Sequence, residues 1–230
     1  MKNLRQASGG TRPYYTETDV EHMCEDALRE FGYYPSSPQR VNIDRFIEKR
    51  FKLSLRFEDM PQGVLGFSKF GANGMVSMHI SQALADEDSR AAERRVSTTL
   101  AHEAGHGLMH SHLFALPDYD STLFGHNQDV EAQKILCRDE QATPKRSYDG
   151  RWWELQANMA IGPLLMPRKL LAEALRPFLR SRGTFGAEEI IPTRREEAAR
   201  QLAEIFEVNP AVARIRIDKL YKPAGNQLTL

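Results

Sequence analysis

Two histidines and a glutamate near the middle of the chain have the spacing H-E-x-x-H. His102 and His106 are four residues apart, so on a helix their imidazoles lie on one face and can bind the same metal ion. Glu103 lies beside them, where its carboxylate can take a proton from water without being a ligand. Zinc lowers the pKa of a bound water to about 7. The pattern therefore predicts a hydrolytic zinc site that requires a third protein ligand.

The third ligand is expected from a largely apolar segment, residues 152–161, whose composition is typical of a buried helix. Glu154 is the only ionisable residue within it, and an unpaired buried carboxylate is costly, whereas zinc would compensate its charge. Asn158 lies four residues further on the same helical face, where it can hydrogen-bond a metal-bound histidine and orient its ring. The alternative is a Glu154 at the solvated start of the helix, with Asn158 as a surface residue.

Three motifs in this order resemble the ImmA/IrrE family of bacterial zinc endopeptidases, over roughly residues 38 to 222. The motifs are Thr99-Leu100-Ala101-His102-Glu103-Ala104-Gly105-His106, then Glu154-x-x-Ala157-Asn158-x-Ala160, and then Leu164-Leu165-Met166-Pro167.

The resemblance implies a gluzincin-like metallopeptidase with zinc ligands His102, His106 and Glu154 and the catalytic carboxylate Glu103. Members of the family act on helix-turn-helix repressors, so a repressor of that type is the expected protein substrate. Manganese could take the place of zinc. This agrees with the assignment made from the residues alone.

Elements that would position these residues can be predicted from hydrophobic periodicity. Two helices are expected between residues 18 and 51, the first capped by Thr18 or Asp19, and three strands follow at 53–57, 64–70 and 75–81. Ser89 is expected to cap the helix that carries the histidines. The predicted fold class is α+β, with a small antiparallel sheet packed on a zincin-like helical core. An edge strand of that sheet could pair with an extended substrate, or the strands could simply cover the core.

Other polar residues near the motif have no spacing that selects them. His110 and His112 are expected at the end of the motif helix, where the macrodipole favours histidine. Residues 113–150 form a long irregular insertion, and such insertions beside a site are often functional. Within it, Tyr148 and His126 are guesses for the group that stabilises the oxyanion.

We predict three regions: a poorly ordered arm at residues 1–16, a zinc metallopeptidase domain at 17–182 and a helical C-terminal extension at 183–230. Within the extension, helices at 195–206 and 209–222 resemble a helix-turn-helix. Its second helix carries Arg214, Arg216, Lys219 and Lys222. A second hypothesis is therefore a DNA-binding or partner-binding regulator with a structural or sensing metal, although packing elements are favoured over direct DNA binding.

Composition narrows the classes of protein. The 230 residues carry 31 basic and 31 acidic side chains, so there is no global electrostatic argument for nucleic acid. Cys24 and Cys137 form no C-x-x-C pair, which favours a reducing compartment. No apolar run approaches the ~20 residues that span a bilayer, and residues 1–19 lack the apolar region of a signal peptide. We therefore expect a cytoplasmic protein without a membrane segment.

Overall fold

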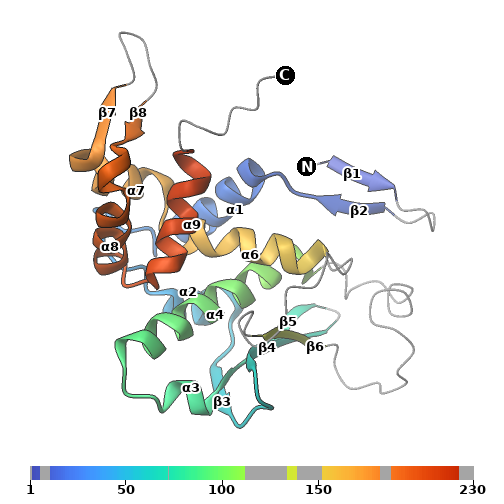
Figure 1. The fold of residues 1–230 in the computed structure, drawn as a ribbon. Coiled ribbons are helices and arrows are strands. Elements are labelled where there is room, and N and C mark those ends of the chain that lie inside the picture. Colours follow the sequence, from blue (N-terminus) through green and yellow to red (C-terminus); the bar gives the residue numbers. More distant parts are fainter. Residues whose placement is uncertain are drawn as a thin grey trace.

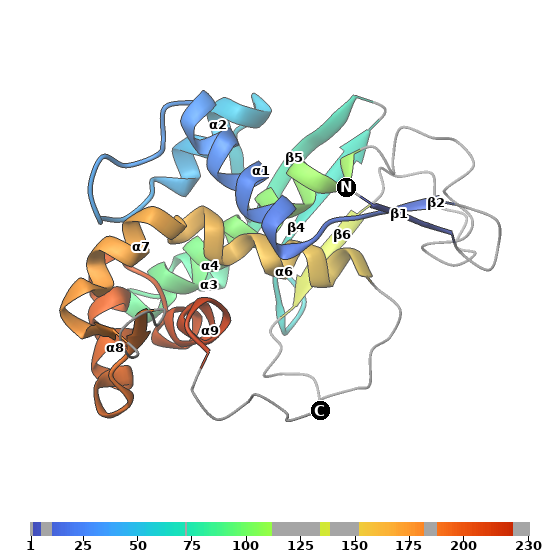
Figure 2. The same cartoon turned by 90° about the horizontal axis from the view of Figure 1, so that it is seen from above.

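A long helix, α4 (Arg90–Met109), lies between a small sheet and helix α6 (Trp152–Leu165), as Figure 1 shows. The computed structural model describes residues 2–5, 11–71, 73–111, 134–138, 152–181 and 188–222. Helices α1 (Glu17–Glu30) and α9 (Pro210–Leu220) contact α6 in turn (Figure 2). The expected α+β class is confirmed, and the two helices that were predicted to carry the site are neighbours.

Four strands form the sheet in the order β3-β5-β4-β6. Their bounds are Leu55–Glu58 for β3, Val64–Gly71 for β4, Gly74–Ser81 for β5 and Lys134–Arg138 for β6. The β4–β5 hairpin lies where the sequence predicts it. The prediction of an antiparallel sheet is wrong for one edge, because β3 runs parallel to β5. The chain reverses direction after β3 and again after β4, and β5 then inserts between these two strands, so β3 and β5 point the same way.

Helix α4 begins after the residue predicted to cap it. The hydroxyl of Ser89 accepts a hydrogen bond from the backbone nitrogen of Ala92 at 3.1 Å, which satisfies one N–H group of the first turn. Strand β4 comes very near the helix at Gly66, where an added Cβ atom would lie 2.8 Å from the Cγ2 atom of Thr99. The absence of a side chain at position 66 therefore lets the strand lie directly on the helix.

The two N-terminal helices follow the predicted pattern with one change at a cap. Helix α1 is capped by Thr16, not by Thr18 or Asp19. Thr16 and Asp19 form a capping box, in which the Thr16 hydroxyl accepts from the Asp19 nitrogen and the Asp19 carboxylate accepts from the Thr16 nitrogen. Helix α2 (Ile43–Phe51) buries Phe46 against the core. Residues ahead of α1, predicted as a poorly ordered arm, include the antiparallel strands β1 (Lys2–Arg5) and β2 (Thr11–Tyr14).

The remaining described elements are short, apart from the two helices predicted near the C-terminus. Helix α8 (Arg195–Ile205) and helix α9 pack on each other, and the Asn209 side chain caps α9 by accepting from the Ala211 nitrogen at 2.9 Å. The others are α3 (Gln82–Ala85), α7 (Arg168–Leu175), η3 (Arg176–Phe178), β7 (Leu179–Ser181), β8 (Glu188–Ile190) and η4 (Pro192–Arg194).

A buried ion pair joins α9 to α1 and to the end of α6. Arg216 is only 4% exposed, and its guanidinium donates two hydrogen bonds to the Glu21 carboxylate, one of them at 2.8 Å. It also donates to the carbonyl oxygen of Met166 at 3.2 Å. Gly162 leaves the room that the Arg216 side chain occupies, because an added Cβ atom would lie 2.8 Å from its Cδ atom. Arg216 is therefore a packing residue and not an exposed cation.

Replacing Arg216 by methionine is expected to lower the free energy of unfolding by about 3–5 kcal/mol, because Glu21 would keep a buried charge without its partner. Urea denaturation followed by circular dichroism measures the change. The double exchange of Glu21 and Arg216 to methionine should recover much of the loss, since it removes both charges. The structural role of the pair would be disproved if Arg216→Met cost no more than Arg214→Ala, a change at an exposed ion pair.

Candidate metal centre

The centre is built where α4 and α6 cross at very short range. Gly105 stands between the two histidines of the motif, and an added Cβ atom there would lie 2.9 Å from the Cβ atom of Ala160 and 3.1 Å from the carbonyl oxygen of Ala157. Three small residues thus face one another at the crossing. This close contact brings side chains from both helices to a common point, although Glu154 lies 48 positions after His106 in the sequence.

Three potential ligand atoms converge at this crossing. The Nε2 atoms of His102 and His106 are 3.0 Å apart, and the Glu154 Oε2 atom lies 3.2 Å from the first and 3.7 Å from the second. Within the described residues, this is the group of His, Cys, Asp and Glu side chains whose geometry suits a metal ion. The structure therefore brings together the three residues that the sequence proposes as ligands. Glu154 lies in the first turn of α6, yet it faces the histidines and not only solvent.

The hydrogen bond on the far side of His102 determines which nitrogen can bind a metal. Its Nδ1 atom lies 2.9 Å from the Oδ1 atom of Asn158, and an amide oxygen can only accept, so Nδ1 carries the proton. In the neutral ring, the Nε2 lone pair then points toward His106 and Glu154. Asn158 is exposed, but it has the orienting contact that the spacing predicts.

The donor set fits a cation such as zinc. Two imidazole nitrogens and one carboxylate oxygen are the ligands of many zinc sites, and a cation between them would offset the repulsion of the converging lone pairs. Burial lowers the pKa of His106 to about 4, so this ring is neutral at neutral pH. Burial alone would raise the pKa of Glu154, but hydrogen bonds with His102 and His106 outweigh it and hold that pKa well below its usual range. A neutral His106 and an ionised Glu154 are the forms that bind metal.

Glu103 is completely buried beside the candidate ligands. Its Oε2 atom accepts a hydrogen bond of 2.5 Å from the hydroxyl of Ser68 on β4, whereas its Oε1 atom has no hydrogen-bond partner among the described residues. Burial raises the pKa of the Glu103 carboxyl to about 7, against the lowering effects of His102 and Ser68. One oxygen is thus held by the sheet, and the other is available to a reacting group.

Sequence reasoning missed Ser68, which lies 35 residues before Glu103 on a strand, with no spacing that relates the two. It also assigned His110 only to the helix end. His110 does occupy the C-cap of α4, but it is completely buried, and its ring contacts both His106 and Gln156. Of the other polar residues considered, His112, His126 and Tyr148 lie outside the described residues.

His79 takes no part in this centre. Its ring stacks on Phe67 with centroids 4.3 Å apart and hydrogen-bonds to Glu58 and Ser77. Phe67 and Ser68 are consecutive on β4, so their side chains point to opposite faces of the sheet. Because Ser68 faces Glu103, His79 and Phe67 lie on the face turned away from α4.

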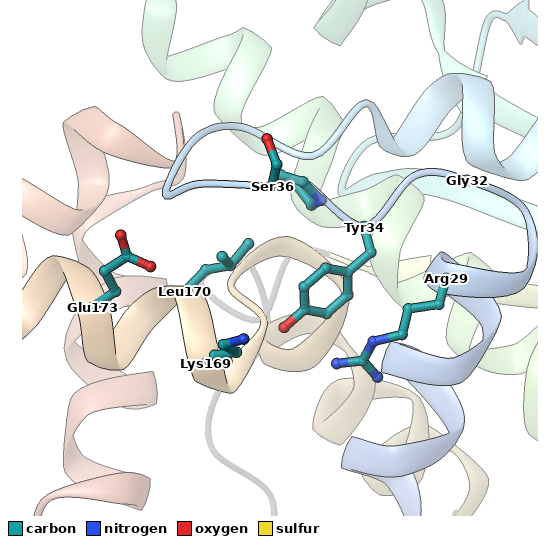
Figure 3. A pocket seen from close by; sticks show the side chains of 8 residues that line it. Arg29, Gly32, Tyr34, Ser36, Lys169, Leu170 and Glu173 are labelled. Carbon is teal, nitrogen blue, oxygen red and sulfur yellow. The ribbon is translucent and has the colours of Figure 1, made fainter.

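A separate pocket of about 470 Å³ lies between the end of α1 and helix α7 (Figure 3). Arg29, Tyr34 and Lys169 line it together with Glu173, so both signs of charge are present. Arg29 is already paired with Glu25 at 2.7 Å. None of the residues that line this pocket belongs to the metal centre, and we assign it no function.

Comparison of the sequence with protein-family models and with curated proteins finds no match.

Replacing Gly105 by alanine is expected to weaken zinc binding and lower the stability of the fold. Alanine favours a helix by about 1 kcal/mol over glycine, but overpacking against the rigid backbone of Ala157 costs about 1–3 kcal/mol. Zinc affinity can be measured by competition with a chromogenic chelator, and stability by thermal unfolding. Glu93→Ala on the exposed side of α4 serves as the control; it should leave zinc affinity unchanged and lower stability by no more than about 1 kcal/mol, because Glu93 lies in the first turn of the helix. Unchanged zinc affinity in Gly105→Ala would show that the helix crossing does not control the site.

Zinc affinity is expected to fall as the pH is lowered. Burial alone would lower the pKa of His102, but its hydrogen bond with Glu154 and the carboxylate charges raise it above the ordinary 6.5. Below this raised pKa the ring holds a proton that zinc must displace, so affinity should drop about tenfold per pH unit. Titration calorimetry in buffers of different ionisation enthalpy would detect the released proton. Constant affinity between about pH 5 and 8 would contradict this prediction.

Proposed function

We propose that this protein is a zinc-dependent endopeptidase in which His102, His106 and Glu154 hold the metal. The observation that carries the proposal is the convergence of these three ligand atoms beside a buried carboxylate, Glu103, with one oxygen unpartnered among the described residues. When bound, zinc would supply Lewis acidity that polarises a carbonyl group and acidifies water. Manganese could serve in place of zinc.

Glu103 acts as the general base in this proposal. Its Oε1 atom accepts a proton from the attacking water while the water oxygen bonds to the carbonyl carbon of the substrate. The same carboxyl then delivers the proton to the amine nitrogen as the carbon–nitrogen bond breaks. Ser68 holds the other oxygen, and a pKa near 7 lets the group both take and return a proton at neutral pH.

The substrate class is proposed from the resemblance to the ImmA/IrrE family. By that resemblance, the proposed substrate is a regulatory protein of the helix-turn-helix repressor class. In this proposal, the candidate metal centre would hydrolyse a peptide bond of the repressor.

Direct DNA binding receives less support from the structure. Three basic residues of α9 that suggested it are engaged with acidic side chains: Arg214 with Glu196 at 2.8 Å, Lys219 with Glu17 at 3.6 Å, and Arg216 with Glu21 in the core. A structural zinc is usually closed by four protein ligands, whereas the group in the described part of the chain offers three. Both observations favour a peptidase over a DNA-binding protein with a structural metal.

Location in the cytoplasm remains part of the proposal. In the described ranges, no helix combines the length and apolar character needed to cross a lipid bilayer.

Glu103→Gln is expected to bind zinc normally and to lose peptide hydrolysis by at least about 10²–10⁴-fold, because glutamine can accept from Ser68 but cannot take a proton from water. The assay incubates zinc-loaded protein with a purified helix-turn-helix repressor and measures fragment masses. Glu93→Gln, an exposed change on the same helix, is the matched control and should cleave as the wild type does. Hydrolysis by Glu103→Gln at the wild-type rate would overturn the proposed role of this residue.

A further inference from the structure

His110 extends the row of histidines on α4 by one more turn. Its Nδ1 atom lies 2.9 Å from the Nδ1 atom of His106, on the side of His106 that faces away from His102 and Glu154. Residues four apart on a helix drift by about 40°, so two steps displace His110 by about 80° from His102. This displacement places His110 behind His106 and not among the atoms that converge on the metal position.

Gln156 on α6 completes a chain of three side chains. The Nε2 atom of His110 lies 3.0 Å from the Oε1 atom of Gln156, and both residues are buried. The ring of Trp152 meets the His110 ring edge to face, with centroids 5.6 Å apart, which restricts how the imidazole can turn. The chain therefore connects the two helices a second time, next to the ligands.

Gln156, the last of these three side chains, sets the direction of each hydrogen bond between them. The Gln156 oxygen can only accept, so the proton of a neutral His110 is on Nε2 and its Nδ1 atom has a lone pair. That lone pair can only accept, so the proton of His106 is on Nδ1. The remaining nitrogen of His106, Nε2, is then left with its lone pair directed at the metal position.

We propose that His110 and Gln156 form a hydrogen-bond relay that fixes His106 in the tautomer able to bind the metal. Both are positioning residues, since neither has an atom in the group of converging ligands. If the Gln156 amide nitrogen faced His110, every bond would reverse, and the His106 Nε2 atom would carry a proton where the metal must bind. The orientation of one amide group thus determines whether His106 can be a ligand.

The relay is tested by two measurements on the full chain. The first is the tautomer of His106 in metal-free protein labelled with ¹⁵N-histidine, read from long-range ¹H–¹⁵N correlation spectra. The second is zinc affinity, measured by competition with a chromogenic chelator. His110→Phe keeps an aromatic ring beside Trp152, and Gln156→Met keeps the length of the side chain, but each removes the acceptor. In the wild type, His106 should be protonated on Nδ1.

Both variants should weaken zinc binding by about 10–100-fold, the usual effect of losing the partner of a ligating histidine. They should also let a population of His106 protonated on Nε2 appear. His110→Asn places an amide oxygen within reach of the His106 Nδ1 atom and should recover most of the affinity. Asn158→Ala is the matched control, because it should alter the spectrum of His102 and leave the tautomer of His106 unchanged.

Wild-type zinc affinity and an unchanged His106 tautomer in folded His110→Phe and Gln156→Met would overturn the relay. If His110→Phe does not fold, judged by circular dichroism, Gln156→Met and His110→Asn still decide the matter. The inference rests on the proposed function only in placing a metal at His106. A wild-type protein that binds zinc but cleaves no repressor would refute the peptidase proposal, while the tautomer and affinity data would still test the relay.

Discussion

The contact between α4 and α6 at Gly105 is the constraint on which the candidate centre depends. Each helix alone carries an incomplete set of ligands: two histidines on one and a carboxylate on the other. Because Gly105, Ala157 and Ala160 let the two backbones approach closely, the ligand atoms of His106 and Glu154 come within 3.7 Å of each other. The sheet reinforces this arrangement from the other side, where Gly66 brings β4 against α4 and Ser68 to Glu103.

Burial around His106 makes the orientation of its polar neighbours important for the site. His106, His110 and Gln156 are nearly or completely buried, so water cannot correct a misplaced proton or a reversed amide among these three side chains. His102 contacts the amide of Asn158 directly. His106 contacts His110, which in turn contacts the amide of Gln156, so both connections lead to an amide side chain on α6. Helix α6 thus contributes the candidate ligand Glu154 and also the amide oxygens that face the two candidate histidine ligands or their partner on α4.

Periodicity and spacing predict the parts of this site that lie on the two helices. The four-residue steps from His102 to His106 and from Glu154 to Asn158 each place two side chains on one face, and the pair on α6 contacts the pair on α4. Spacing carries no information on contacts between distant segments, which is why Ser68 was missed and Arg216 was grouped with surface cations. The parallel pairing of β3 was missed for a related reason: alternation predicts strands but not their order in a sheet.

Through Arg216, the two C-terminal helices help to hold α6, the helix that carries Glu154, in place. Its guanidinium joins α9 to α1 and to Met166, immediately after the helix that carries Glu154. The C-terminal helices are consequently not a detachable module, even though a helix pair of this kind suggests one. A shortened chain that ends before α8 would expose the Glu21 carboxylate and Gly162 together, so any altered behaviour of such a fragment would report on the support of α6 as much as on a missing binding surface.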